Sequence, residues 1–407
     1  MGADMADINN DGYPEVFVTD MLPDEEYRLK TTASFENINI YTLKQKRGFY
    51  HQYMQNSLQL NDQNQRFREI AYFSGVAASD WSWGALMFDA DNDRYADIFV
   101  CNGIYHDVID QDFIDFFANE MMQEMAITGQ KEDVDAVINK MPSNPIVNKA
   151  FRNKGNLQFE EMSENWGFDL PSFSNGSAYG DLDNDGDLDL VINNVNQAAF
   201  VYQNHSEQLA DHHYLSVALK GPAANPSAIG AKVSVFAAGE EINRQLIPTR
   251  GFQSSVDYRL SFGLGTVDRI DSLRVVWPDR SRSIWEALPV DTFLVLTYEV
   301  PRERGVVRNI SPTTFLKEAA HPFEAHQEDN FIDFYFERNI PLKTSHEGPH
   351  AARADVDGDG LEDIYIGGAV GQAGQLYLQK EGSFKKQEQA IFEEYANFED
   401  TALLFFD

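Results

Sequence analysis

Short runs rich in β-branched and aromatic residues recur along this chain of 407 residues, and segments rich in Asp, Asn and Gly separate them. Such runs are typical of β-strands, because branched and aromatic side chains pack well on a pleated surface. Four of them follow the same kind of acidic segment, at residues 16–19, 98–101, 190–193 and 364–367. The pattern therefore predicts an all-β dominated fold.

Two segments interrupt the strand pattern. Residues 107–141 carry apolar side chains at helical spacing, which predicts a helical insertion with one core-facing side. The apolar stripe consists of Ile114, Phe117, Met121 and Met125. Residues 21–55 lack the strand pattern and are expected to form a non-strand excursion.

The charge balance is strongly acidic, with 65 Asp and Glu against 32 Lys and Arg and a net charge of −33. Nucleic-acid binding requires basic stripes that displace counterions from phosphate, so we expect no nucleic-acid partner. A single cysteine, Cys101, excludes an intrachain disulfide framework. No apolar run approaches the roughly 20 residues of a membrane-spanning helix. The carboxylates are therefore either a solvated surface or a set of cation ligands.

The positions of the carboxylates favour cation binding. Residues 7–15, 89–97, 181–189 and 355–363 each carry Asp, Asn or Glu at the first, third, fifth and ninth positions. Calcium takes six to eight oxygen ligands at about 2.3–2.6 Å, and alternate residues of a tight loop can direct carboxylates at one point. The seventh residue can add its backbone carbonyl. We predict about four structural Ca²⁺ sites, with the ligands Asp7, Asn9, Asp11, Tyr13, Glu15, Asp89, Asp91, Asp93, Tyr95, Asp97, Asp181, Asp183, Asp185, Asp187, Asp189, Asp355, Asp357, Asp359, Leu361 and Asp363.

Two other interpretations of these loops are weaker. An EF-hand needs a bidentate Glu at position 12 and flanking helices, but position 12 is Val18, Val100, Ile192 and Ile366. Solvated Asp/Gly turns would explain one loop, but not four copies that share ligand positions and a following strand. In the second loop Arg94 replaces the glycine of the sixth position, so the sequence leaves open whether that loop holds metal.

The pattern D-x-[DN]-x-D-G-x-x-[DE] followed by a strand resembles the FG-GAP/VCBS repeat of integrin-α-like β-propellers. Residues 56–77 and 150–168 read as two versions of one unit that runs into the next loop. Residues 225–235, 250–254, 262–265 and 275–278 resemble the ASPIC/UnbV domain, which accompanies such repeats in bacterial secreted proteins and in the cartilage acidic protein family. The resemblance implies a calcium-stabilised propeller with an inserted β-domain.

These observations predict the organisation of the chain. Residues 1–106 are assigned to propeller repeats, 107–141 to the helical insertion, 142–212 to a further repeat, 213–300 to the ASPIC/UnbV-like domain, and 301–407 to a linker and further repeats. Without its insertions a repeat has about 55–60 residues, the size of a four-stranded blade. We expect an incomplete ring of about four blades plus partial ends. Residues 402–407 resemble 85–89, which would make Asp407 the first ligand of a fifth loop in a longer protein.

The sequence contains no motif whose residues and local context together predict catalysis. Residues 346–350 match the zinc signature H-E-x-x-H, but Gly348 and Pro349 oppose the helix that this motif requires. Trp81 and Trp83 could stack on a sugar, although core packing is the commoner role. We expect a non-enzymatic, calcium-binding adhesion or recognition module for a protein or glycan. It would be extracellular, periplasmic or on the outer cell surface. The alternative is a carbohydrate-active lyase or hydrolase, or a glycan-binding component, on the same scaffold.

Overall fold

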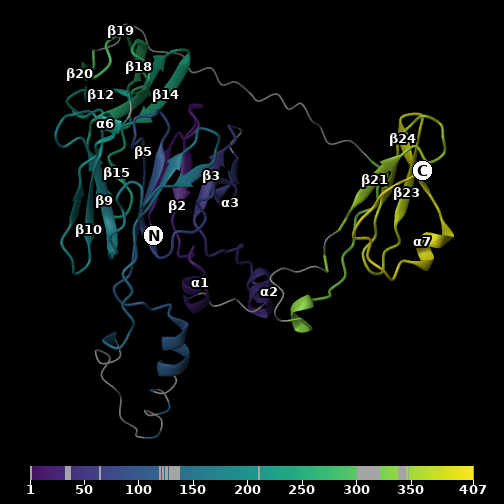
Figure 1. Cartoon of the computed structure of the whole chain (residues 1–407). Coiled ribbons are helices and arrows are strands. Elements are labelled where there is room, and N and C mark those ends of the chain that lie inside the picture. The colour runs from purple at the N-terminus through teal and green to yellow at the C-terminus, as the bar shows by residue number, and fades with distance from the viewer. Residues whose placement is uncertain are drawn as a thin grey trace. The chain divides into compact units, whose positions relative to one another are not determined.

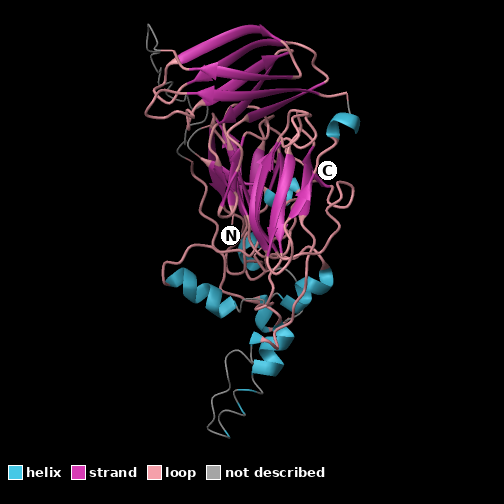
Figure 2. Ribbon diagram, turned by 90° about the vertical axis from the view of Figure 1, so that its left-hand side faces the viewer, coloured by secondary structure: helices cyan, strands magenta, loops and turns pink. Residues whose placement is uncertain are grey.

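The computed structural model describes residues 2–32, 38–63, 66–118, 121, 123, 127, 138–209, 211–299, 321–337, 345–346 and 348–406. The chain separates into two compact units (Figure 1). Unit 1 comprises Met1–Glu36 and Lys44–Ile310, and unit 2 comprises Asn37–Leu43 and Ser311–Asp407. Strands predominate over helices in the described residues, as Figure 2 shows, so the all-β dominated fold is confirmed.

The first part of unit 1 contains three antiparallel sheets, each made of strands that follow one another along the chain. The first sheet has the order β1 (Ala3–Ala6), β2 (Glu15–Val18), β3 (Ser57–Asn61) and β4 (Phe67–Glu69). The second has the order β5 (Ser82–Phe88), β6 (Asp97–Asn102), β7 (Lys149–Asn153) and β8 (Phe159–Glu161). The third contains β9 (Ser174–Gly180), β10 (Asp189–Asn194) and β11 (Phe200–Tyr202).

The first strands of these sheets lie side by side, with β1 next to β5 and β5 next to β9. Gly2 and Gly84 each stand five residues before the first Asp of an acidic loop. A Cβ on Gly2 would lie 2.3 Å from the Trp83 carbonyl oxygen, and one on Gly84 would lie 2.7 Å from the Asn175 carbonyl oxygen. Only glycine permits such a close approach, so this position sets the spacing between neighbouring sheets.

Apolar side chains fill the space between neighbouring sheets. One buried cluster joins the first two sheets and includes Phe17, Leu58, Met87, Ile98 and Phe151. Another joins the second and third sheets and includes Leu86, Phe99, Leu190 and Ile192. The β-branched and aromatic residues that predicted the strands are thus the residues that pack sheet against sheet.

A buried polar chain of two Asn and two Ser residues occurs twice between the sheets. In the first copy, hydrogen bonds of 2.6–2.9 Å connect Asn56, Ser79, Ser82 and Asn102. In the second copy, hydrogen bonds of 2.7–3.0 Å connect Asn148, Ser174 and Asn194, with Ser172 bonded to Ser174. Buried amides and hydroxyls require such partners, and their repetition indicates that the sheets are copies of one structural unit.

The two predicted interruptions contain helices, and a further short helix, α3 (Ala71–Ser74), lies between β4 and β5. Residues 21–55 form α1 (Glu26–Thr32) and α2 (Ile38–Lys46), with no strand among their described residues. Of residues 107–141, the described part contains a π-helix (Phe113–Ala118). Within it Ile114 is 39% exposed, whereas Met121 is buried. A π-helical turn does not keep the 3.6-residue period, so the predicted stripe does not form one continuous core-facing side there. Met125 lies outside the described residues.

The last part of unit 1 is a separate β-structure with its own core, preceded by α6 (Ser206–Leu209). One sheet has the order β17 (Leu260–Gly265), β12 (His213–Lys220) and β20 (Thr292–Thr297). A second has the order β14 (Glu240–Gln245), β13 (Lys232–Ala237), β18 (Ile270–Val276) and β19 (Arg282–Leu288). A short pair is formed by β15 (Thr249–Arg250) and β16 (Ser254–Ser255). The core includes Val217, Val233, Phe262, Leu273 and Trp277.

Unit 2 contains one antiparallel sheet with the same consecutive strand order. Its strands are β21 (Ala351–Ala354), β22 (Asp363–Ile366), β23 (Gln375–Lys380) and β24 (Ser383–Gln387), followed by α7 (Ala390–Glu394). The ring of Tyr377 is buried and packs against Phe323 at 4.9 Å. The sheets of the described residues form no closed barrel or propeller. None of the described helices is long and apolar enough to cross a membrane.

Candidate metal centres

The four acidic loops occupy the same place in four sheets, because each joins the first strand of its sheet to the second. They connect β1 to β2, β5 to β6, β9 to β10, and β21 to β22. The predicted strand after each loop is therefore the second strand of a sheet. A loop at this position is held at both ends by an antiparallel ladder, which fixes the direction of its side chains.

The first carboxylate of the loop closes the turn. In three loops its two oxygens accept the backbone N–H groups of the fifth and sixth residues at 2.8–3.0 Å. These acceptors are Asp7, Asp89 and Asp355. In the third loop, Asp181 Oδ1 is buried and has no hydrogen-bond partner. A buried carboxylate oxygen without a donor is unfavourable, and a bound cation would satisfy it.

The ninth carboxylate bridges the loop to the third strand. One oxygen accepts the N–H of the second loop residue at 2.8–3.0 Å. The other accepts a backbone N–H from a residue in or just after the third strand at 2.8–3.3 Å. The bridging residues are Glu15, Asp97, Asp189 and Asp363, all at most 2% exposed. The carboxylate at this position is therefore structural in the hairpin, and each oxygen keeps a further lone pair for a cation.

An Asn in or just after the third strand connects loops of neighbouring sheets, a role that the sequence did not reveal. Asn153 Nδ2 donates to the carbonyl oxygens of Ile8 in the first loop (2.8 Å) and Ala96 in the second (3.0 Å). One sheet later, Asn204 Nδ2 donates to the carbonyl of Ala90 in the second loop (2.7 Å). In the sequence, the only indication of this role was the recurrence of Asn at the equivalent position of successive repeats.

Replacing Asn153→Ala is expected to destabilise unit 1 by about 2–3 kcal/mol, because two buried carbonyl groups lose their donor. Thermal or urea unfolding measures the change. Asn165→Ala is the matched control, since Asn165 is exposed, and it should change stability by less than about 0.5 kcal/mol. Equal effects of the two substitutions would show that the connection between loops does not stabilise the sheets.

The fourth residue of the loop provides a second connection. Asn10 Nδ2 donates to the Arg94 carbonyl, and Asn92 Nδ2 donates to the Gly186 carbonyl, both at 3.3 Å. Both Asn residues have φ of +56°, a left-handed conformation that Asn tolerates better than other residues with side chains. The first three loops thus form a continuous hydrogen-bonded row within unit 1.

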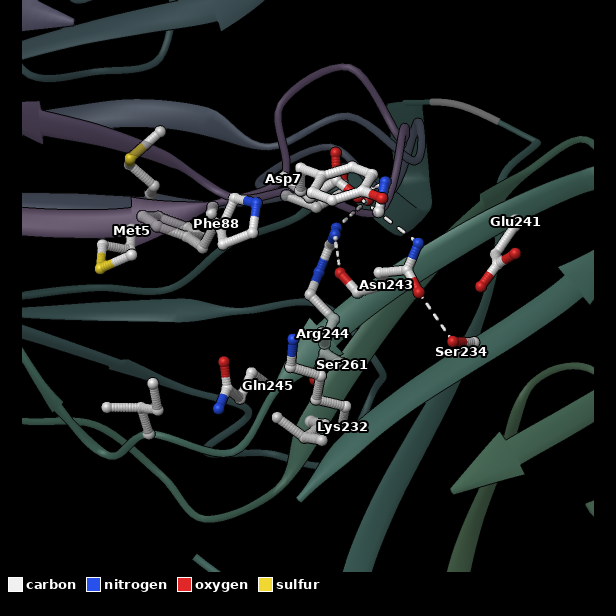
Figure 3. Close-up of a pocket in the computed structure, with 18 of the residues that line it drawn as sticks. Met5, Asp7, Phe88, Lys232, Ser234, Glu241, Asn243, Arg244, Gln245 and Ser261 are labelled. Atoms are coloured by element: carbon white, nitrogen blue, oxygen red, sulfur yellow. Dashed lines mark hydrogen bonds and ion pairs between the residues drawn. The ribbon is translucent and has the colours of Figure 1, made fainter. Parts of the chain in front are cut away.

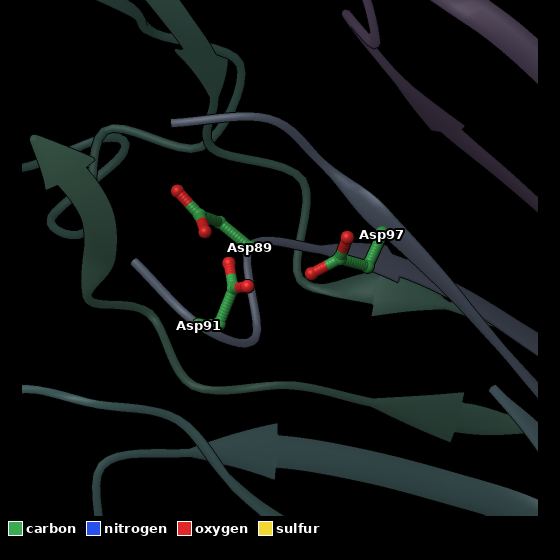
Figure 4. A group of neighbouring side chains, drawn as sticks. All are labelled: Asp89, Asp91 and Asp97. Carbon is green, nitrogen blue, oxygen red and sulfur yellow. The ribbon is translucent and has the colours of Figure 1, made fainter. Parts of the chain in front are cut away.

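Predicted ligands converge in the second, third and fourth loops, whereas the described carboxylates of the first loop form no such group of three. Asp89, Asp91 and Asp97 have carboxylate oxygens within 4.8 Å of one another (Figure 4), and the same holds for Asp181, Asp183 and Asp185 and for Asp355, Asp357 and Asp359. In the first loop Asn9 Oδ1 accepts the Asp11 N–H at 3.2 Å. The fifth carboxylate accepts the seventh N–H at 2.9–3.3 Å. The seventh residues are Tyr13, Tyr95, Asp187 and Leu361. This all-oxygen set fits Ca²⁺.

Burial raises the pKa values of several loop carboxyls. The pKa of Asp89 rises to about 8, first because of burial, and then through the neighbouring Asp93 and Asp91, with Arg244 opposing the rise. Burial likewise raises the pKa of Glu15 to about 7, and that of Asp97 well above its usual range. Without a cation these groups retain protons near neutral pH. A divalent ion would stabilise their ionised forms.

Cationic side chains compete for the second loop in particular. Arg152 lies 2.8 Å from Asp91 and 3.2 Å from Asp93, and Arg244 Nη2 lies 3.8 Å from Asp89 Oδ2. Arg94, which replaces the turn glycine, has φ of +90°. The second loop is thus the most neutralised of the four, and a calcium ion there must displace or tolerate these arginines.

The third loop contains an acidic group that the sequence did not predict. The Asp187 side chain, assigned only a backbone role from the sequence, lies with Asp185 and Glu207 of α6, and their oxygens are within 4.8 Å. Asp187 is 1% exposed, and its Oδ1 has no hydrogen-bond donor. Burial raises the pKa of Asp187 to about 8, with further contributions from Glu207 and Asp185. Glu207 is distant in sequence from the motif, so no spacing rule could have identified it.

The other sequence candidates do not form a site. Of the H-E-x-x-H segment, Glu347 lies outside the described residues, and His346 and His350 lie in an irregular segment before β21. Neither histidine is on a helix, so the geometry that the zinc motif requires is not formed. Trp83 packs against Phe252 at 5.0 Å, and Trp81 is 8% exposed, so both tryptophans serve packing.

Comparison with known proteins identifies one domain of the chain. Residues 221–303 match the family model described as ASPIC and UnbV. The match supports the ASPIC/UnbV part of the resemblance and falls on the β-structure that contains β13–β20. The search of curated proteins found no match. The FG-GAP/VCBS repeats therefore stay a prediction from the motif.

Proposed function

We propose that this chain is a calcium-stabilised recognition module of the FG-GAP/VCBS type, with an ASPIC/UnbV domain attached to its repeats. In this proposal the sheets β1–β4, β5–β8 and β9–β11 are successive blades of an integrin-α-like propeller, and β21–β24 is a further blade. The observation that carries the proposal is the hydrogen-bond pattern shared by the four hairpins, in which equivalent carboxylates make equivalent bonds.

Calcium would act on the scaffold rather than in chemistry. The residues that would hold it are the first, third, fifth and ninth side chains of each loop, with the seventh carbonyl. In the second, third and fourth loops the ion would neutralise carboxylates that lie within 4.8 Å of one another, and in each loop it would hold the hairpin between its first two strands. Because the loops of unit 1 bond to one another, order imposed on one loop would be passed to the next.

The proposed location is outside the cytoplasm, in an extracellular, periplasmic or outer-surface setting. Extracellular modules bind calcium with dissociation constants of about 10⁻⁴–10⁻³ M. The arginines beside the second loop reduce the charge available to an ion, which agrees with this weak range. In a millimolar calcium medium such sites would be largely occupied.

A binding role is better supported than a carbohydrate-active enzyme. A pocket of about 710 Å³ lies in unit 1, and four carboxylates line it. Asp7, Asp11 and Asp89 belong to the acidic loops, and Glu241 is paired with Arg274 at 2.6 Å. No histidine is among its lining residues. A hydrolase would need two unengaged carboxyl groups facing one substrate bond, and this pocket offers no such pair.

Calcium titration of chelator-treated protein tests the proposal. We expect about four ions per chain by calorimetry, and little response to Mg²⁺, which requires smaller and more rigid octahedral sites. The double substitution Asp181→Asn and Asp183→Asn should remove one ion from the stoichiometry. Glu286→Gln is the matched control, because Glu286 is exposed and lies outside the loops. If calcium neither binds nor stabilises the protein, the loops are solvated turns and the proposal fails.

A further inference from the structure

The pocket of unit 1 has a basic lining although the chain as a whole is acidic. It lies between the first two acidic loops and the sheet β14-β13-β18-β19 of the ASPIC/UnbV domain (Figure 3). Its lining includes six cationic side chains and only the four carboxylates named above. The cations are Lys232, Arg244, Arg250, Arg259, Arg274 and Arg282. Since acidic residues outnumber basic ones two to one in the sequence, this local excess of cations is a specific feature of the pocket.

The polar wall of the pocket is one face of the ASPIC/UnbV sheet. Strand register places Gln245, Lys232, Val276 and Arg282 in one row across four strands. A second row contains Asn243, Ser234 and Arg274. The opposite face of the same sheet carries the buried core residues Val233, Val235, Leu273 and Val275. Because successive side chains of a strand point to opposite faces of the sheet, the amides, the hydroxyl and the cations of these rows face the pocket together.

Within the described part of the chain, Lys232 and Arg282 have no ion pair, and Arg244 has only the long contact with Asp89. Arg250 pairs with Asp4 at 2.7 Å and Arg259 with Asp257 at 2.6 Å, so these two are structural. Arg244 is 13% exposed, and its buried Nη2 has no hydrogen-bond partner, with Asp89 Oδ2 at 3.8 Å. Lys232 and Arg282 lie exposed at the edge and have no ion pair within the described part of the chain. Arg244 Nη1 donates to the Asn243 carbonyl at 3.0 Å, so Nη2 is the nitrogen of this guanidinium that is left for a ligand carboxylate or sulfate.

The opposite wall of the pocket combines apolar side chains with the carboxylates of the first two acidic loops. Met5, Met87, Phe88 and Leu188 come from the first strands and loops of the three sheets, and Tyr13 is 43% exposed at the edge. A ligand that fits both walls needs an apolar face, hydroxyl groups and negative charge. A sugar ring presents C–H groups on one face and hydroxyls around its rim, and an acidic sugar adds the anion.

We propose that this pocket binds an acidic oligosaccharide, with anionic groups on Arg244, Lys232 and Arg282, hydroxyl groups on Asn243, Gln245 and Ser234, and a ring face on Tyr13 and the methionines. The assignment deepens the proposed recognition function and rests on it. The pocket volume of about 710 Å³ is within the range that encloses a ligand of this size.

The pocket also contacts the acidic loops directly. Asn243 Nδ2 donates to Asp7 Oδ2 at 3.4 Å, and Arg244 lies against Asp89, the first carboxylate of the second loop. An ion bound in these loops would neutralise Asp7 and Asp89. Asn243 and Arg244 would then be available to bind the saccharide. Calcium should therefore tighten saccharide binding, and by thermodynamic reciprocity the saccharide should tighten calcium binding.

The test is calorimetric titration of a glucuronate-containing oligosaccharide into the full chain, first with chelator and then with millimolar calcium. The matched ligands are its carboxyl-reduced neutral form and a sulfated oligosaccharide of equal length, which separate carboxylate from sulfate recognition. We expect the neutral form to bind at least about tenfold more weakly than the better of the two anionic ligands, since about 1.4 kcal/mol corresponds to a factor of ten. Calcium should increase affinity by about fivefold or more.

The variants assign the binding to the pocket. Lys232→Ala with Arg282→Ala should weaken binding at least about tenfold without altering unfolding, because both residues are exposed. Arg269→Ala, an exposed arginine of the same domain outside the pocket, should leave affinity unchanged. Equal binding of neutral and acidic sugars, or an intact affinity in the double variant, would overturn the proposal. Binding of a fatty-acid anion but of no saccharide would also overturn it.

The titration in the presence of chelator distinguishes a failure of this inference from a failure of the proposed function. Saccharide binding in chelator, without any calcium binding, would support the pocket and refute the calcium loops. Calcium binding without any saccharide binding would support the loops and refute the pocket.

Discussion

Gly186→Ala is expected to destabilise unit 1 by about 2–4 kcal/mol. Gly186 is the sixth residue of the third loop and has φ of +102°, a conformation that residues with a Cβ rarely adopt. A Cβ there would lie 2.1 Å from Cε1 of Tyr214, the residue of β12 whose ring covers the turn. The Gly186 carbonyl also accepts the bond from Asn92, so a shifted turn would weaken the second loop as well. Thermal and urea unfolding measure the loss.

Gly12→Ala is the matched control for this substitution. Gly12 occupies the same position of the first loop with φ of +86°, but a Cβ would meet Asn243 Nδ2 only at 3.7 Å, an ordinary contact. Gly12→Ala should lower the free energy of unfolding through backbone strain alone, by about 1–2 kcal/mol. The double variant Gly186→Ala and Tyr214→Ala should recover the part of the loss that is due to the collision. If both single variants lose the same stability, the Tyr214 contact has no energetic role.

Calcium is expected to raise the melting temperature more at about pH 8 than at about pH 6. In the calcium-free protein the pKa values of Asp89 and Asp187 are raised to about 8 and that of Glu15 to about 7 by burial. The folded state therefore holds protons that the unfolded chain releases near pH 4. The stability of the calcium-free protein should then fall as pH rises from about 5 to about 8, because over this range the folded state binds more protons than the unfolded state.

A bound calcium ion replaces these protons, so its stabilising effect should grow over the same pH range. We expect the calcium-induced increase in melting temperature to differ by several degrees between the two pH values. Calorimetric titration in two buffers of different ionisation enthalpy should also detect proton release at about pH 7. Asp355→Asn serves as a control, because its loop in unit 2 is exposed and should leave the pH dependence of unit 1 unchanged. An equal calcium effect at both pH values would contradict the linkage.

The recognition surface inferred for unit 1 combines two parts of the fold, the acidic loops and the ASPIC/UnbV sheet. The acidic loops lie at one edge of the three sheets, and the basic face of the ASPIC/UnbV sheet lies against the first two of them. The loops alone present carboxylates, which would repel an acidic ligand. The ASPIC/UnbV domain supplies the cations, so the two parts are complementary in charge.

The sequence by itself determined the local elements of this protein. The spacing of Asp7, Asn9, Asp11 and Glu15, repeated in three later loops, identified the hairpins, because side-chain direction within a tight loop follows from local spacing. The β-branched runs after the loops identified the second strands of four sheets, since the enrichment of β-branched and aromatic residues in a strand is also a local property. The residues of the ASPIC/UnbV resemblance likewise located a domain that the family match supports.

Only the tertiary structure decided how these elements act together. The double role of Asp97 as bridge to the third strand, the reach of Asn153 into the preceding loop, and the approach of Glu207 to Asp187 all join residues far apart in sequence. The basic pocket arises in the same way, from strands of the ASPIC/UnbV sheet and loops of the first sheets. Such contacts depend on how sheets pack, and packing is set by the whole set of apolar faces rather than by any local spacing.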